Sequence, residues 1–162
     1  MHRFAPAATM VAAIATTAGM LLTGPAAKAE NVIELTQVAC QFIESENGVD
    51  RGYETQDKSD CVAINERTAS ARLKKAKVLR LDPGTHTFKV TNKDVPYPLG
   101  FWVREADYQP GNPLHKLTKV SVSGGGLTAG ETKSYTVDLE PGEYLYSCPL
   151  NPTPDYRLVV EK

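Results

Sequence analysis

The sequence is poor in the side chains that most often bind transition metals. Its 162 residues include three His, three Cys and three Met, and every Met lies within the first 20 residues. Beyond residue 29, the chain has two histidines and no thioether. It also has no His-Glu-x-x-His, Cys-x-x-Cys or Gly-x-Ser-x-Gly motif, the usual signatures of zinc hydrolases, thiol oxidoreductases and serine hydrolases. We therefore do not expect an enzyme.

Clustered positive charge is also scarce. The chain carries 18 basic and 19 acidic residues, and residues 1–29 account for two of the basic ones and none of the acidic ones. The remainder therefore has 16 basic against 19 acidic residues. Nucleic-acid affinity comes mainly from clustered Lys and Arg, and the one cluster, around residues 74–80, is short. We expect no nucleic-acid partner.

The first 29 residues have the pattern of a signal peptide. A short basic region at residues 2–3 precedes an apolar run at 9–22, and small residues at 27 and 29 mark a cleavage site. The apolar run is too short to span a membrane. We expect cleavage of residues 1–29, leaving a domain at 30–162 with no membrane span in the periplasm or outside the cell. An uncleaved N-terminal anchor is the alternative.

Three cysteines remain in the exported chain, where disulfides persist. Cys40 and Cys61 flank a polar stretch at residues 44–60, and we expect them to form a disulfide. Closing that loop would contribute about 3 kcal/mol by the chain-entropy estimate. Cys148 is then unpaired, and it could be an intermolecular link, a metal ligand or a buried thiol.

Alternating apolar and polar residues between Pro- and Gly-containing turns predict a single all-β domain. This spacing is typical of an antiparallel sandwich or barrel. A helix is predicted from Cys61 to Lys75, with Ser59 as its cap, within an insert at about residues 40–75. Its expected apolar stripe consists of Val62, Ile64 or Asn65, Ala69 and Leu73. The expected strands cover residues 32–36, 85–91, 99–103, 119–123, 131–139, 144–148 and 156–160.

Two motifs stand out in the second half of the chain. In the first, Asn92 precedes Tyr97 by five residues, and Tyr97 directly follows Pro96. The second is Tyr146-Ser-Cys148-Pro-Leu-Asn151. Here Cys148 lies at the end of an alternating strand, and Asn151 follows three residues later.

Both motifs resemble those of the cupredoxins, the blue-copper domains, over about residues 78–162. In that family the positions of Tyr97 and Asn151 are ligand histidines, and the position of Cys148 is the thiolate ligand. The resemblance implies an antiparallel Greek-key cupredoxin-like sandwich or barrel with a short helical insert. It also implies a degenerate copper site, because a type 1 centre needs two imidazoles and a thiolate and only Cys148 is kept.

The favoured hypothesis is an exported binding or accessory protein with a degenerate type 1 copper site, rather than a conventional electron carrier. Its partner would be a protein docking at the Pro-rich loop end, near residues 96–98 and 150–155. The alternative is a copper-binding protein for periplasmic metal handling or electron transfer, in which Cys148 and His115 or His86 form a rebuilt site. Thiol-redox chemistry at Cys148 is a third hypothesis. Copper is the one cofactor that the resemblance implies, and the missing ligands argue against it.

Overall fold

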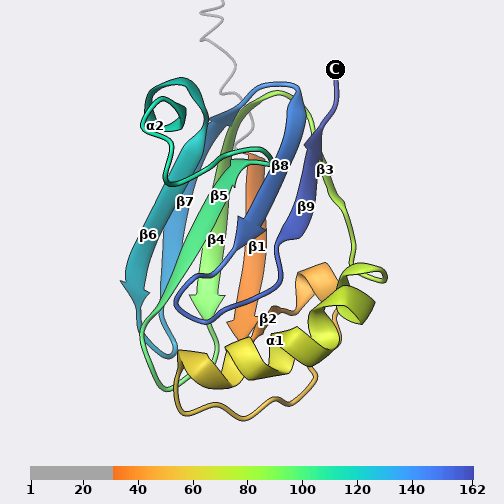
Figure 1. Ribbon diagram of the computed structural model, residues 1–162, viewed down its shortest axis with the longest axis vertical. Helices are drawn as coiled ribbons and strands as arrows, with labels where there is room; N and C mark the ends of the chain where they lie inside the picture. The colour runs from red at the N-terminus through yellow and green to blue at the C-terminus, as the bar shows by residue number, and fades with distance from the viewer. Residues whose placement is uncertain (1–30) are drawn as a thin grey trace, which may run out of the picture.

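The computed structural model describes residues 31–162 and shows two β-sheets packed face to face (Figure 1). The predicted signal peptide lies outside the described residues. The strands are β1 (Asn31–Val38), β2 (Gln41–Phe42), β3 (Leu79–Leu81), β4 (Gly84–Asn92), β5 (Leu99–Glu105), β6 (Ser121–Leu127), β7 (Thr132–Leu139), β8 (Gly142–Ser147) and β9 (Tyr156–Val160). The helices are η1 (Glu44–Glu46), α1 (Lys58–Leu73) and α2 (His115–Thr118).

The sheets have mixed strand directions, so the expectation of purely antiparallel sheets was wrong. One sheet has the order β2-β1-β4-β7 and the other the order β3-β9-β8-β5-β6. Two pairs are parallel, β1 with β4 and β3 with β9, and the others are antiparallel. Sequence alternation shows which residues form a strand but not its direction, because the side-chain period is two in either case. The prediction of a two-sheet β-protein is confirmed.

The core lies between the sheets and is rich in aromatic rings. Along β4, Phe88 and Val90 are fully buried and Lys89 is exposed, as alternation predicts. The ring of Phe101 on β5 packs against Phe88 and Tyr135, with both centroid separations 5.1 Å. Each buried aromatic side chain removes a large apolar area from water, so these rings hold the two sheets together.

The helix α1 differs from the prediction in its capping residue and in the residues that it buries. It begins at Lys58, capped by Asp57, whose carboxylate accepts the backbone N–H of Ser59 at 2.7 Å. The predicted apolar stripe was wrong at both its ends, because Val62 is 46% exposed and Leu73 is 38% exposed, whereas Ile64 is partly buried against the disulfide. The fully buried residues of α1 are Cys61 and Arg72. A disulfide and a buried ion pair therefore hold this helix in place, with a small apolar contact beside them.

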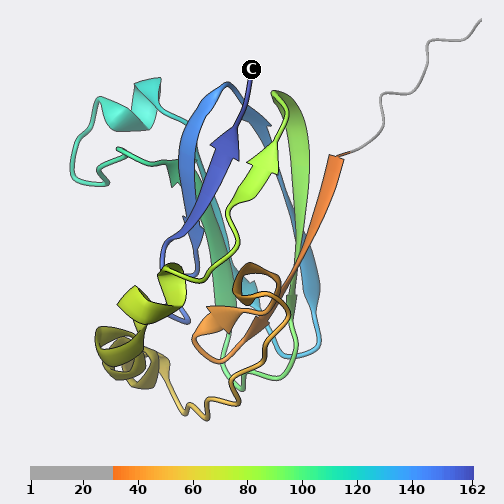
Figure 2. The same cartoon turned by 90° about the vertical axis from the view of Figure 1, so that its right-hand side faces the viewer.

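The insert closes one end of the sandwich. Two perpendicular views show β2, η1 and α1 gathered where β1 and β8 end and β5 begins, whereas α2 lies at the opposite end (Figures 1 and 2). This arrangement covers the end of the sandwich that carries Cys148. No helix among residues 31–162 is long and apolar enough to cross a membrane.

Candidate functional site

Cys148 directly follows β8 and its thiol is buried against two backbone amides. The sulfur accepts the N–H of Gly100 at 3.3 Å and that of Asn151 at 3.2 Å. Burial raises the pKa of the thiol, and these hydrogen bonds oppose that rise in part. Gly100 lies at an irregularity in the β5–β6 pairing, where an added Cβ would come within 2.6 Å of the carbonyl oxygen of Gly124. A glycine is therefore needed at this contact.

Asn151 is the central polar residue of this end. Its side chain is fully buried, and its amide nitrogen donates to the carbonyl of Val38 at 2.9 Å. Its amide oxygen accepts the N–H of Cys40 at 2.9 Å and lies 3.1 Å from the sulfur of Cys61. The second contact is not a hydrogen bond, because Cys61 is oxidised and has no proton to donate. The amide thus joins the loop after β8 to the insert.

Tyr97 completes the group. Its hydroxyl donates to Oγ1 of Thr55 at 3.1 Å, and it lies 3.4 Å from Oδ1 of Asn151 and 3.9 Å from the sulfur of Cys61. Burial raises the pKa of Tyr97, which keeps the phenol protonated. The structure therefore brings Tyr97, Asn151 and Cys148 together, and the side chain of Asn151 is directed at the disulfide.

The Cys40–Cys61 disulfide is confirmed, with a sequence separation of 21 between the two positions. Its place in the fold was not foreseen, because it lies directly against Asn151 and Tyr97. We call the group of Tyr97, Cys148, Asn151 and this disulfide the closed end.

Asn92 holds the turn that carries Tyr97. Its side chain accepts the N–H of Val95 at 2.9 Å and donates to the carbonyls of Val95 and Leu127 at 3.1 and 3.2 Å. The buried amide therefore joins the end of β4 to the end of β6. The first motif of the sequence has a structural role in positioning Tyr97.

Neither histidine lies at the closed end. His115 is in α2, at the other end of the sandwich, and its Nδ1 accepts the N–H of Gln109 at 3.0 Å. His86 is buried near the start of β4, and its Nε2 lies 2.8 Å from the carbonyl oxygen of Asp82. The structure does not bring either histidine to Cys148. Within residues 31–162, no group of three or more His, Cys, Asp or Glu side chains is arranged to hold a metal ion.

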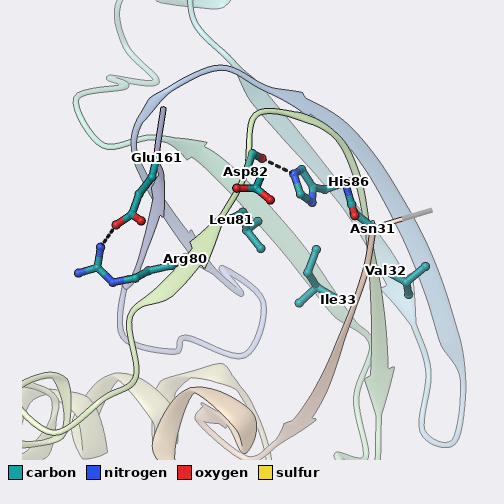
Figure 3. A pocket seen from close by; sticks show the side chains of 8 residues that line it. All are labelled: Asn31, Val32, Ile33, Arg80, Leu81, Asp82, His86 and Glu161. Carbon is teal, nitrogen blue, oxygen red and sulfur yellow. Dashed lines mark hydrogen bonds and ion pairs between the residues drawn. The ribbon is translucent and has the colours of Figure 1, made fainter. Parts of the chain in front are cut away.

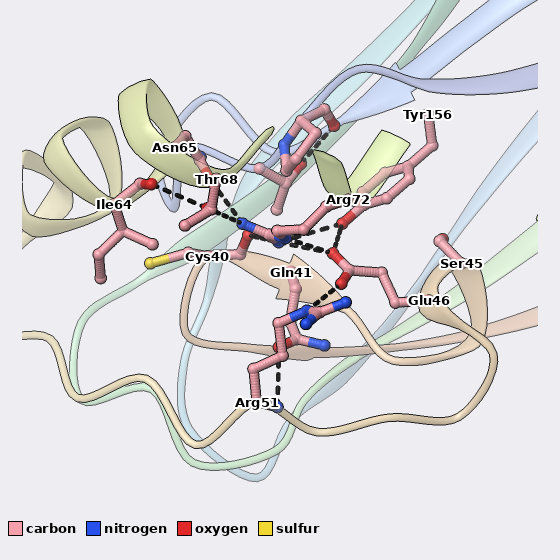
Figure 4. Close-up of polar contacts among 12 residues, drawn as sticks. Cys40, Gln41, Ser45, Glu46, Arg51, Ile64, Asn65, Thr68, Arg72 and Tyr156 are labelled. Carbon is pink, nitrogen blue, oxygen red and sulfur yellow. Dashed lines mark hydrogen bonds and ion pairs between the residues drawn. The ribbon is translucent and has the colours of Figure 1, made fainter. Parts of the chain in front are cut away.

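A buried ionic network attaches the insert to the sandwich (Figure 4). Glu46 accepts hydrogen bonds from Nη2 of Arg72 at 2.6 Å and from the hydroxyl of Tyr156 at 2.7 Å. Arg72 also donates to the carbonyl of Cys40 at 2.8 Å, beside the disulfide. Burial by itself would raise the pKa of Glu46, but the hydrogen bonds from Arg72, Tyr156 and Arg51 outweigh it and lower the pKa. The sequence reasoning missed this network.

The two Pro-containing loops next to the closed end expose four uncharged side chains, although Lys93, Asp94 and Asp155 in the same loops are also exposed. Pro96, Pro98, Pro149 and Leu150 are all exposed. Leu150 is 41% exposed and its side chain lies over Gly100 and Gly125. Proline fixes φ and so restricts both loops. We call these four exposed uncharged side chains, on two loops stiffened by proline, the proline surface.

These observations define a class of protein, a two-sheet β-sandwich with one end closed by a disulfide-linked helical cap. No protein-family model matches the chain, and no curated protein matches it either. The function is therefore inferred from the side chains themselves.

Proposed function

We propose that this protein is an exported binding or accessory protein on a cupredoxin-like Greek-key sandwich, and not a conventional copper electron carrier. The observation that carries this proposal is the set of contacts made by Asn151. Its amide bonds Val38 and Cys40 and touches Cys61, in place of the free imidazole that a copper centre requires. Asn151 therefore has a structural role, because it holds the insert against the end of the sandwich.

The cupredoxin-like topology is supported by the path of the chain. After β4 the chain enters the second sheet for β5 and β6, returns to the first for β7, and enters the second again for β8 and β9. Repeated exchange between two sheets is the usual result of Greek-key connections in sandwiches. Export is supported by the disulfide, because disulfides persist mainly in oxidising compartments.

The donor set at the closed end fits copper poorly. The phenol of Tyr97 has a raised pKa, so its phenolate form is disfavoured. The oxygen of Asn151 is a hard donor that already accepts a backbone N–H. Type 1 copper is held by a soft thiolate and two imidazoles, and Cys148 provides only the first of these. The alternative of a rebuilt copper site would need a histidine from the far end of the sandwich.

Copper titration tests this proposal. With Cu(II) added to the chain lacking residues 1–29, we expect no intense visible charge-transfer band, because that band requires a short copper–thiolate bond. Absorption spectroscopy and electron paramagnetic resonance would measure it. Cys148→Ser is the control variant. A coloured species that forms in the wild type and is lost in this variant would restore the rebuilt copper site as the better hypothesis.

The proline surface is the proposed docking site for a protein partner. A rigid surface loses little conformational entropy on binding, and the lack of charge on Pro96, Pro98, Pro149 and Leu150 removes a desolvation penalty. The partner would therefore present an apolar, uncharged patch of its own.

Site-specific photo-crosslinking tests this docking site. A photoreactive amino acid at Leu150 should give a discrete protein adduct in the cells that make this protein. The matched control is the same substitution at Leu117, which is 85% exposed on α2 at the opposite end. Mass spectrometry of the adducts would identify the partner. Equal labelling from both positions, or labelling from Leu117 alone, would contradict the proposal.

A further inference from the structure

The two long sides of the sandwich differ. On one side, the edge strands β6 and β7 approach each other. On the other side, the first half of β1 faces β3, and the two strands are not hydrogen-bonded to each other (Figure 2). Among the described residues, β3 pairs only with β9, and residues 31–35 of β1 pair only with β4. We call this opening the β1–β3 seam.

Backbone groups of both strands point into the seam. Thr36 O accepts the N–H of Ile43 at 3.0 Å and Thr36 N donates to Glu44 at 2.7 Å, so the polar groups of Thr36 face away from β4. Backbone direction alternates along a strand, so those of Glu34 and Val32 face the same way. On β3, the carbonyl of Leu81 accepts the N–H of Glu161 at 3.1 Å, on the β9 side.

By the same alternation, the N–H and C=O of Arg80 face the seam. The seam therefore has backbone donors and acceptors, at Val32 and Glu34 on β1 and at Arg80 on β3, to which no described strand is paired. Such an edge is a template for adding a further strand.

Two cavities lie along the seam. Their volumes are about 300 Å³ and 190 Å³, and both are lined by Ile33. Leu81 lines the larger cavity, and Leu35, Leu79 and Tyr146 line the smaller one. The five residues of β1 that border the seam span about 16 Å at the usual rise per residue. An extended segment of about five residues, with apolar side chains at alternate positions, matches these dimensions.

The larger cavity ends at a buried histidine without a full set of partners (Figure 3). His86 is 2% exposed, and its Nε2 donates to the carbonyl of Asp82, since a carbonyl can only accept. In the neutral ring Nδ1 is then an acceptor, and it is buried with no hydrogen-bond partner. In Figure 3 the ring lies above Ile33, at the same end of the cavity as Asp82. This end of the seam therefore favours a hydrogen-bond donor.

The charged residues around the seam favour a cationic donor. Four acidic and two basic side chains line the two cavities, and Arg80 and Glu161 are ion-paired with each other, which leaves three acidic residues against one basic residue. An ammonium group can donate to His86 and at the same time meet the carboxylate of Asp82. The acidic residues are Glu34, Glu44, Asp82 and Glu161, and the basic ones are Lys77 and Arg80.

We propose that the β1–β3 seam binds an extended, lysine-containing segment of a partner protein as an added strand, with the lysine ammonium at the His86 end. The backbone edge of β1 supplies the main-chain hydrogen bonds, the apolar cavities take alternate side chains, and His86 with Asp82 selects the cation. This site lies on the side of the sandwich and is separate from the proline surface, so it goes beyond the function proposed above.

The probe is an array of hexapeptides that alternate valine and threonine, with one lysine at either end, compared with the same peptides carrying glutamate. Amide hydrogen exchange, followed by NMR, should slow at Val32, Glu34 and Arg80 when a lysine peptide binds. We expect binding of the glutamate peptides to be at least about tenfold weaker. The proposal would be overturned if none of the lysine peptides protected these amides at about millimolar concentration. Equal binding of the lysine and glutamate peptides would also overturn it.

Two variants at one position isolate the backbone contribution. Glu34→Pro removes an outward N–H while leaving the bonds to β4, since proline is tolerated on the free side of an edge strand. Glu34→Ala is the matched control, because it removes the same carboxylate and keeps the N–H. Peptide affinity should fall about tenfold further in the proline variant. Equal affinities in the two variants would contradict strand addition.

His86→Phe tests the polar end separately, and it should reduce the preference for lysine over glutamate while keeping the amide protection. An unchanged preference would overturn the role of His86.

A second copy of the chain is the other possible occupant of the seam. In that case the same amides would be protected without peptide, and the protection would rise with protein concentration. This result would overturn the proposal.

Discussion

Replacing Glu46 with glutamine is expected to lower the free energy of unfolding by about 3–5 kcal/mol at pH 7. The substitution leaves the guanidinium of Arg72 buried without its counter-charge, since the side chains of Arg72 and Glu46 are 3% and 1% exposed. It also weakens the hydrogen bond from Tyr156. Chemical denaturation followed by circular dichroism would measure the change.

The effect should depend on pH with a definite sign. The pKa of Glu46 is lowered from its ordinary value of 4.5 in the folded protein. A depressed carboxylate pKa contributes stability that is present above the unfolded value and is lost as pH falls through the folded value. The difference between wild type and variant should therefore be constant above about pH 5 and shrink below pH 4.5.

An exposed ion pair is the matched control for this experiment. Glu143 pairs with Arg157 at 3.2 Å, with side-chain exposures of 64% and 57%. Pairs of this kind are worth between 0 and about 1 kcal/mol, so Glu143→Gln should have little effect at any pH. A loss below about 1 kcal/mol in Glu46→Gln would show that the network contributes little to stability. A larger loss that persists unchanged at pH 3 would show that it does not come from the charge of Glu46.

The second large effect is expected in the double variant Tyr97→His with Asn151→His, which puts histidine at the two positions that resemble the cupredoxin ligands. Loss of the Asn151 amide leaves the N–H of Cys40 and the C=O of Val38 without partners in a buried site. An unsatisfied buried group costs about 1–3 kcal/mol, so the metal-free variant should lose about 2 kcal/mol or more. Thermal and chemical denaturation would both report this loss.

The same variant should gain affinity for copper. The two imidazoles would stand close to Cys148, whose sulfur contacts the backbone of residue 151 at 3.2 Å. A thiolate with two imidazoles is the donor set of type 1 copper. The control is Tyr97→Phe with Asn151→Leu, which removes the hydrogen bonds and adds no ligand. It should lose similar stability and gain no copper affinity. Equal copper binding by both double variants would mean that the histidines do not act together with Cys148.

Local patterns gave correct predictions for the strands and their buried faces, and for the disulfide. The alternation of Phe88, Lys89 and Val90 places a strand and its buried face without knowledge of its neighbours. The pairing of Cys40 with Cys61 follows from an intervening polar loop and a third cysteine that lies far along the chain. The existence of α1 was also predictable, although its cap and buried face were not.

The ionic network could not be predicted, because its partners are distant in the chain. Glu46 and Tyr156 are 110 positions apart, and Glu46 and Arg72 are 26 apart. A buried arginine in α1 has the same local pattern as a solvated one on a helix surface. Only the packing of η1 and α1 against β9 excludes water and makes the pairing strong.

The sequence by itself determined that this is a β-rich domain with one disulfide, and that Tyr97 and Asn151 stand at the two positions that resemble the cupredoxin histidine ligands. Only the tertiary structure decided what these two residues contact. The contacts of Asn151 with Cys40 and Val38 span 111 and 113 positions, and the direction of each strand depends on neighbours from other parts of the chain. Such contacts are set by the packing of the two sheets and the cap, since a side chain's own sequence neighbours do not specify what it will meet in the folded core.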